Sequence, residues 1–136
     1  MPLGAGQNFT RTGRRAVAIS PDGTKIAYIA NNQIYLRHMH ESEAQPIRGT
    51  NVDPIDLTFS PDGQEIAFFT PTAPQGPPSS VNLRKIRITG GTPVTLCSAL
   101  SPFGLRWQGD TLVVGQGRSI ATVAETGGKP RTLVSV

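Results

Sequence analysis

The side chains best suited to metal chemistry in this 136-residue sequence are two histidines. His38 and His40 stand two residues apart at the end of a predicted strand, so their imidazoles would share one face, with Glu41 nearby. Paired imidazoles can bind zinc, but a structural zinc site needs four protein ligands and a catalytic site needs three. We therefore expect surface histidines at a strand end, and no metal site.

Two aspartates, Asp22 and Asp62, could be imagined as a carboxylate pair for acid–base chemistry. Each lies in the sequence Pro-Asp-Gly. In such a turn proline fixes φ, aspartate bonds nearby backbone and glycine supplies a positive φ at no steric cost. A structural role in two tight turns is the favoured interpretation.

Other catalytic signatures are absent from the sequence, which contains no Ser/His/Asp or Cys/His set, no phosphate-binding loop and no metal motif. Cys97 is the only cysteine, so no disulfide can form within the chain and the redox compartment cannot be inferred. It lies in the apolar run 94–97 and is expected to be a small buried hydrophobe. The sequence thus predicts a chain that is not an enzyme and needs no cofactor.

Charge gives only a weak indication of partners. The net charge is +4 and the pI about 9.8, but charged residues make up only 16% of the chain. Arg11, Arg14 and Arg15 form the one basic cluster and have no aromatic stacking platform beside them, so we expect a solvated edge and no nucleic-acid partner.

Residues 1–6 show no signal peptide, and no stretch reaches membrane-spanning length, so no membrane partner is expected and localisation stays open.

An internal repeat organises most of the chain. The segment ISPDGTKIAY at residues 19–28 recurs as FSPDGQEIAF at residues 59–68. A second landmark, GGTPVTL at residues 90–96, returns as GGKPRTL at residues 127–133. The third copy of the first landmark is degenerate and reads WQGDTLV at residues 107–113.

Each repeat contains four short β-compatible segments separated by turn residues, the content of one propeller blade. We expect an all-β fold of three four-stranded antiparallel β-propeller blades, with little or no helix. The predicted strands are 16–20, 25–30, 33–39 and 45–48 in the first blade, 55–60, 64–70, 81–88 and 93–97 in the second, and 104–107, 111–115, 118–123 and 130–134 in the third. The predicted organisation is an N-terminal arm, 1–13, followed by a three-blade half-propeller, 14–136, with blades 14–52, 53–98 and 99–136.

These motifs resemble a known family. The pattern Ser-Pro-Asp-Gly-x-x-Ile-Ala-Phe/Tyr, the strand Ile34-Tyr35-Leu36 and the closing Gly-Gly-x-Pro-x-x-Leu are similar to the WD40-like repeats of TolB-type propellers, over residues 14–134. Segments 46–50 and 91–97 particularly resemble propellers appended to bacterial serine/threonine kinases and regulators. The resemblance implies a binding scaffold whose relatives are periplasmic or attached to membrane-bound kinases. The third blade departs from the pattern because it lacks Ser-Pro at its first turn.

Three blades are too few to close a ring, since propellers usually have four to eight. An uncovered sheet face of roughly 300 Å² marks an interface. We expect a homodimer in which blade three of each chain packs on blade one of the other, forming six blades around one channel. The alternatives are an arrangement other than a ring and a fragment of a longer chain, such as half of a six-bladed propeller.

The expected function is a non-catalytic binding or protein-interaction scaffold, with a small-molecule or sugar-binding sensor as the alternative and a propeller-type enzyme as the third possibility. Candidate ligand-binding residues on the channel-side strands are Arg15, Asp56 and Arg106. Trp107 is expected to pack between blades. The loop 70–80 contains two Pro-x-x-Pro spacings compatible with docking to another protein, although such spacings are common in plain loops.

Overall fold

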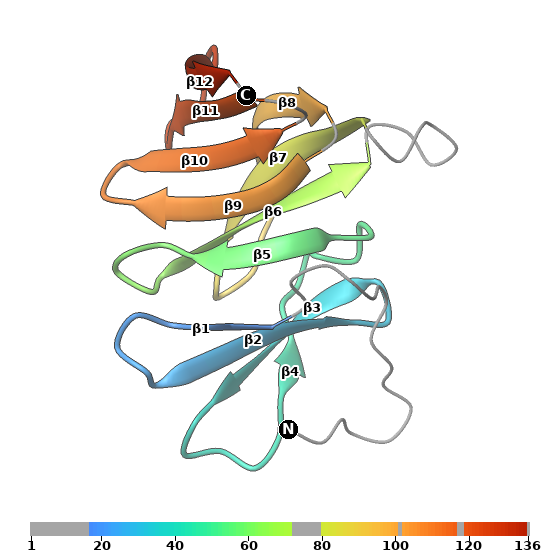
Figure 1. The fold of residues 1–136 in the computed structure, drawn as a ribbon. Helices are drawn as coiled ribbons and strands as arrows, with labels where there is room; N and C mark the ends of the chain where they lie inside the picture. Colours follow the sequence, from blue (N-terminus) through green and yellow to red (C-terminus); the bar gives the residue numbers. More distant parts are fainter. Residues whose placement is uncertain (1–16, 72–79, 101, 117–118, 136) are drawn as a thin grey trace.

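The computed structural model describes residues 17–71, 80–100, 102–116 and 119–135. These residues form twelve strands and no helix, arranged as three sheets of four strands (Figure 1). Blade 1 comprises β1 (Val17–Ile19), β2 (Lys25–Ala30), β3 (Gln33–His38) and β4 (Gln45–Pro46); blade 2 comprises β5 (Ile55–Phe59), β6 (Glu65–Pro71), β7 (Ser80–Arg87) and β8 (Val94–Leu100); blade 3 comprises β9 (Pro102–Gln108), β10 (Thr111–Gln116), β11 (Ser119–Ala124) and β12 (Arg131–Ser135). All pairings are between sequential antiparallel strands, so the predicted fold class is confirmed.

The strands form because their apolar residues alternate in a way that gives each blade two buried faces. In blade 2, Leu57 pairs with Phe68 on the face toward blade 1, whereas Phe69 pairs with Leu83 on the face toward blade 3. One hydrophobic cluster therefore lies between blades 1 and 2, and another between blades 2 and 3. We call these contacts the first junction and the second junction.

The Ser-Pro-Asp-Gly segments are turns, as predicted. The Asp22 carboxylate accepts hydrogen bonds from Ser20 Oγ at 2.7 Å and from the Thr24 backbone N–H at 3.0 Å. The Asp62 carboxylate is held in the same way, by Ser60 Oγ at 2.6 Å and the Gln64 N–H at 3.0 Å. These bonds lower the pKa of both carboxyl groups, the serine hydroxyl being the largest cause in each case.

Blade 3 replaces this turn with a shorter one. Gln108 and Thr111 are directly paired, so only Gly109 and Asp110 lie between the strands, and Gly109 has a φ of 57°. A two-residue hairpin with positive φ has no place for Ser-Pro. The degenerate third copy of the landmark is thus a different turn type.

The Gly-Gly landmarks join neighbouring blades. The Gly91 N–H donates to the Arg48 carbonyl of blade 1 at 3.0 Å, and the Gly128 N–H donates to the Leu96 carbonyl of blade 2 at 3.3 Å. The φ angles of Gly91 and Gly128 are 135° and 124°, which side chains rarely tolerate. We call each of these bonds a Gly-Gly contact.

Two strands near the second junction are longer than the sequence predicts. β8 continues to Leu100, beyond the expected 93–97, because Val81 pairs with Ala99 and Ser80 with Leu100. β9 begins at Pro102 instead of 104. Proline is compatible with the first residue of an edge strand, where no ladder donor is needed.

Candidate functional site: the inner-strand groove

The three innermost strands, β1, β5 and β9, lie side by side, one from each blade (Figure 1). An open groove with a volume of about 640 Å³ runs along them. We call it the inner-strand groove. Its lining residues are Val17, Ala18, Ile19, Pro21, Thr58, Phe59, Arg106 and Trp107.

The backbone contributes to the groove because β1, β5 and β9 are each the edge strand of their sheet. An edge strand leaves a row of N–H and C=O groups without ladder partners. Three such edges meet along the groove.

Arg106 is the charged residue in the lining, and its side chain is exposed. It belongs to a row of paired residues on the face of blade 3 that points away from blade 2: Arg106, Val113, Thr122 and Arg131. Within the described ranges, Arg106 has no ion pair; those found join Lys25 to Asp22 and Lys85 to Glu65.

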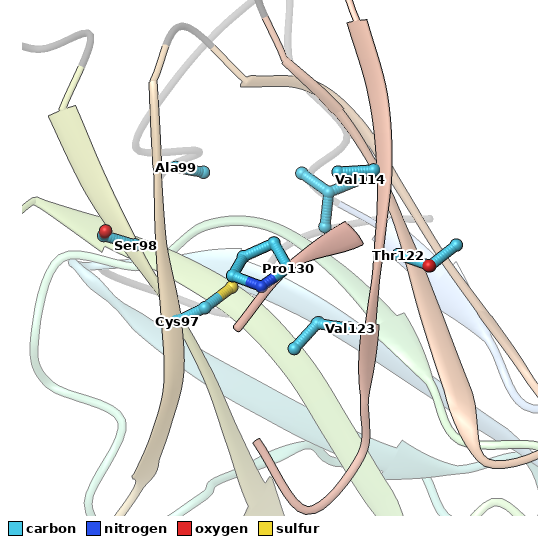
Figure 2. A pocket seen from close by; sticks show the side chains of 8 residues that line it. Cys97, Ser98, Ala99, Val114, Thr122, Val123 and Pro130 are labelled. Carbon is cyan, nitrogen blue, oxygen red and sulfur yellow. The ribbon is translucent and has the colours of Figure 1, made fainter. Parts of the chain in front are cut away.

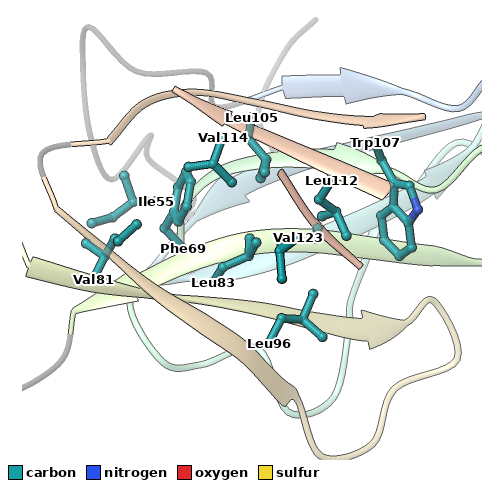
Figure 3. Close-up of a cluster of buried hydrophobic side chains, with 12 residues drawn as sticks. Ile55, Phe69, Val81, Leu83, Leu96, Leu105, Trp107, Leu112, Val114 and Val123 are labelled. Atoms are coloured by element: carbon teal, nitrogen blue, oxygen red, sulfur yellow. The ribbon is translucent and has the colours of Figure 1, made fainter. Parts of the chain in front are cut away.

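Trp107 packs in the second junction with an exposed fraction of 6%, as predicted, and also borders the groove. Figure 3 shows its indole at the end of the cluster, beside Leu112. Its Nε1 is buried and has no hydrogen-bond partner among the residues that the structure describes. Buried indole N–H groups usually find an acceptor, so this donor stands out.

Of the three predicted ligand residues, the structure places one in the groove. Arg106 lines it, whereas Arg15 lies outside the described residues. Asp56 is not among the lining residues; it is 8% exposed, and its carboxylate accepts a hydrogen bond from the Leu57 N–H at 2.8 Å. Asp56 has a φ of 58° beside a register shift in β5, and a bulge of this kind redirects a side chain.

Sequence reasoning missed Thr58 and the exposed apolar residues Val17 and Ile19 as part of the groove. A signal was present in the repeat, because Ala18, Thr58 and Arg106 occupy the same repeat position. Each of them directly precedes one of the aligned residues Ile19, Phe59 and Trp107. Aligned positions on equivalent strands reach the same channel. Val17 and Ile19 are 39% and 62% exposed, so the groove has an open apolar wall.

The other candidate residues form no comparable site. The His38 and His40 rings are 5.9 Å apart and tilted by 47°, and no third His, Cys, Asp or Glu joins them within the described part of the chain. The Pro-x-x-Pro loop lies mostly outside the described residues, as do Arg11 and Arg14. The same described ranges hold no helix long and apolar enough to cross a membrane.

Cys97 borders a small apolar pocket at the second junction that is too narrow for a water molecule (Figure 2). The figure shows its sulfur beside Pro130 of blade 3. The side chain is half-buried, and burial raises the pKa of the thiol. A raised pKa leaves little thiolate, so Cys97 lacks the character of a nucleophile.

No protein-family model and no curated protein sequence matches the chain. Solved structures do match. A TolB-like protein from Agrobacterium tumefaciens is similar with a TM-score of 0.70 and 17% identity, over 88% of this chain and 45% of that protein. TolB from Acinetobacter baumannii matches with a TM-score of 0.65 and 17% identity, over 90% of this chain and 32% of its own. The chain therefore has a β-propeller fold like that of the TolB structures.

The three-blade chain spans less than half the length of the TolB structures it matches. It also resembles a puromycin-hydrolysing peptidase from Mycobacterium tuberculosis, with a TM-score of 0.71 and 19% identity over 98% of this chain and 23% of the peptidase. At such low identities the similarity shows the fold alone.

The prediction that the chain is not an enzyme needs correction. Proteins with similar propellers include that peptidase, the AtxE2 isopeptidase and an oligogalacturonate lyase solved with manganese, at 10% to 19% identity. The physical reason is that one scaffold carries many functions, so the absence of catalytic motifs from TolB-type repeats does not exclude an enzymatic role.

Proposed function

We propose that this TolB-type half-propeller is a protein-interaction module that binds an extended segment of a partner along the inner-strand groove. The observation that carries the proposal is the groove itself, about 640 Å³ of open space beside three edge strands. Ligand sites typically measure about 300 to 1,000 Å³. An extended chain can add along an exposed sheet edge, and neighbouring apolar side chains can provide specificity.

The proposal is tested by selecting extended peptides from an unbiased display library on the immobilised chain. Thr58→Tyr adds bulk inside the groove, whereas Thr132→Tyr makes the same type of change on exposed β12, away from it. Selected peptides should bind wild type and Thr132→Tyr equally, and Thr58→Tyr at least about tenfold more weakly. Peptides that bind all three proteins equally, or a selection that yields none, would contradict the proposal.

A small-molecule sensor is the second candidate, because the volume of the groove also suits a single compact ligand. A sugar or metabolite that raises the melting temperature of wild type, but not of Thr58→Tyr, would favour this function over peptide binding.

A further inference from the structure

We infer that the exposed apolar side chains of β1 form half of a blade junction, and that blade 3 of a second copy of this chain completes it, with Ile19 packed against Val113. The inference goes beyond the proposed function, because it assigns Val17 and Ile19 to the second copy and not to a ligand of the groove. A ligand in the inner-strand groove would then meet Thr58 and the inner strands.

Ile19 lies where the other two blades bury an apolar side chain. It occupies the same repeat position as Phe59 in blade 2 and Trp107 in blade 3. The preceding blade covers Phe59 at the first junction and Trp107 at the second, which leaves them 5% and 6% exposed. Ile19 has no preceding blade among the described residues and is 62% exposed.

Val17 shows the same contrast. It corresponds to Leu57 and Leu105, which are both buried in the clusters of the two junctions, yet it is 39% exposed. Exposed apolar side chains that lie together mark an interface. The exposed positions of β1 are therefore the ones that a preceding blade covers elsewhere in the chain.

The outward face of blade 3 offers the matching surface. Ala27 of blade 1 belongs to the cluster of the first junction, and Ala67 of blade 2 belongs to the cluster of the second. The residue of blade 3 at this repeat position is Val113, which points away from blade 2 and is partly exposed. If a third junction repeats the first two, Ile19 of one copy packs on Val113 of the other.

A second copy fills both uncovered surfaces at once. In a two-fold ring the junction occurs twice and covers four sheet faces of at most roughly 300 Å² each, or at most roughly 1,200 Å² in total. Stable protein interfaces begin at about this area. Because Tyr28 and Tyr35 are already buried on blade 1, the contact there is confined to β1 and its surroundings, so the dimer should dissociate on dilution.

Charge favours the same occupant. Among the described strand residues on the outward face of blade 3, Arg106 and Arg131 are charged and none is acidic. Glu41 and Glu43 are exposed on blade 1 in the turn before β4. Complementary charges steer two surfaces together and fix their register.

The test places one cysteine on each side of the junction, in a Cys97→Ser background that removes the only native thiol. Ile19→Cys and Val113→Cys are made in separate chains, mixed, and treated with a short bismaleimide that can span the roughly 10 Å between packed sheets. The product should have twice the 14.5 kDa chain mass. A mixture of Ile19→Cys with Val94→Cys is the control, because Val94 is exposed on β8, away from both outward faces. It should give at least about tenfold less product, since its thiols lie farther apart than packed sheets.

Sedimentation of single variants provides a second measurement. Ile19→Ser removes an apolar contact that occurs twice in the ring and should weaken the dimer at least about tenfold. Val94→Ser should leave the dimer affinity unchanged. Equal cross-linking of the two mixtures, or a dimer that Ile19→Ser does not weaken, would overturn the inference. A chain that stays monomeric at high concentration would also overturn it and would favour further blades of a longer chain as the occupant. The peptide selection with Thr58→Tyr judges the proposed function separately from each of these results.

Discussion

The two junctions between blades are built from the same repeat positions but differ in how closely the neighbouring blades pack. At the first junction, the Gly-Gly contact measures 3.0 Å, and a methyl group on Gly90 would lie 3.2 Å from the Arg48 carbonyl oxygen. A methyl group on Gly49 of blade 1 would overlap the Gly91 carbonyl oxygen. At the second junction, the Gly-Gly contact measures 3.3 Å, and a methyl group on Gly127 would lie 3.4 Å from the Leu96 carbonyl oxygen. The second junction also holds the small pocket beside Cys97. Equivalent repeats therefore produce one closely fitted contact and one looser contact.

This difference suggests a division of roles between the junctions. Closely packed groups with no room to move transmit strain and resist opening. The looser second junction carries Trp107, which also borders the inner-strand groove. Elements that bind ligands are commonly drawn from the less stable parts of a fold.

The largest expected effect comes from Gly49→Ala at the first junction. Gly49 has a φ of 97°, so alanine adds backbone strain, and its methyl group also meets the Gly91 carbonyl. Strain of about 1–2 kcal/mol and overpacking of about 1–3 kcal/mol should lower the free energy of unfolding by about 2–5 kcal/mol. Urea unfolding measures the loss.

Gly91→Ala is the matched control for this prediction. Gly91 has a φ of 135°, but a methyl group there would have no neighbour within 4 Å. In Gly91→Ala only the backbone strain should lower the free energy of unfolding, by about 1–3 kcal/mol. If the two variants lose equal stability, the close fit assigned to the first junction is wrong.

A second effect should appear in the reactivity of Cys97, which reports on the second junction. Burial raises the pKa of its thiol, so iodoacetamide should modify it at least about tenfold more slowly than free glutathione at pH 8. Gly128→Ala strains the Gly-Gly contact and should accelerate the modification. Gly23→Ala, also at positive φ and without close neighbours but in a turn of blade 1, should not. Equal acceleration by both would show that the reaction follows global unfolding.

A smaller effect separates the turns of the blades. Asp62 accepts hydrogen bonds from Ser60 and Gln64, whereas Asp110 accepts one from the Thr111 hydroxyl at 3.1 Å. Asp62→Ala should cost about 1 kcal/mol and Asp110→Ala less than about 0.5 kcal/mol, measured by thermal unfolding. Reversal of this order would mean that the shorter turn of blade 3 is the more dependent on its aspartate.

The same turn predicts a dependence on pH. The pKa of Asp62 is lowered from 3.8 in the folded chain, so its contribution to stability is complete above that value. The contribution is lost as the pH falls below 3.8 toward the folded pKa. Asp62→Asn should therefore lose less stability than wild type between pH 5 and pH 2.5. An identical acid response in both proteins would contradict this account.

The sequence predicted the blades well because each repeat combines local turn chemistry with alternating apolar residues. Ser-Pro-Asp-Gly determines its own turn through contacts within a few residues. The groove was only partly predictable, because it depends on which inner-strand residues lie beside one another across blades. Arg106 was identified, but the fate of Asp56 depended on a bulge that no local motif announces.

Comparison of the two junctions indicates what a third would require. In the repeat, Glu43 and Ala44 occupy the positions of Gly90 and Gly91. Ala44 disfavours the positive φ that a Gly-Gly contact uses, so blade 1 lacks the means to make this contact with a preceding blade. On its outward face Tyr28 and Tyr35 stack 5.5 Å apart and are 3% and 9% exposed, which leaves the exposed apolar surface on β1.

We nevertheless propose the homodimer, with an exposed ion pair at this third junction where the other two junctions have the Gly-Gly contact. Glu43 is exposed on blade 1, and Arg131 is exposed on the outward face of blade 3, with Lys129 before it. In a ring of two chains, Glu43 of one chain would approach Arg131 of the other. Light scattering at low salt should give twice the 14.5 kDa chain mass. A mass of 14.5 kDa at every concentration would exclude the ring.

Charge reversal gives the smallest and most specific effect. Glu43→Lys should weaken the dimer only a few-fold, because an exposed ion pair contributes at most about 1 kcal/mol. Arg131→Glu should weaken it similarly, and the double variant should restore wild-type affinity. Glu125→Lys, the same charge change in another turn, serves as the control. If both single variants dimerise more weakly and the double variant does not regain the wild-type dimer affinity, Glu43 and Arg131 do not form the proposed ion pair at the third junction.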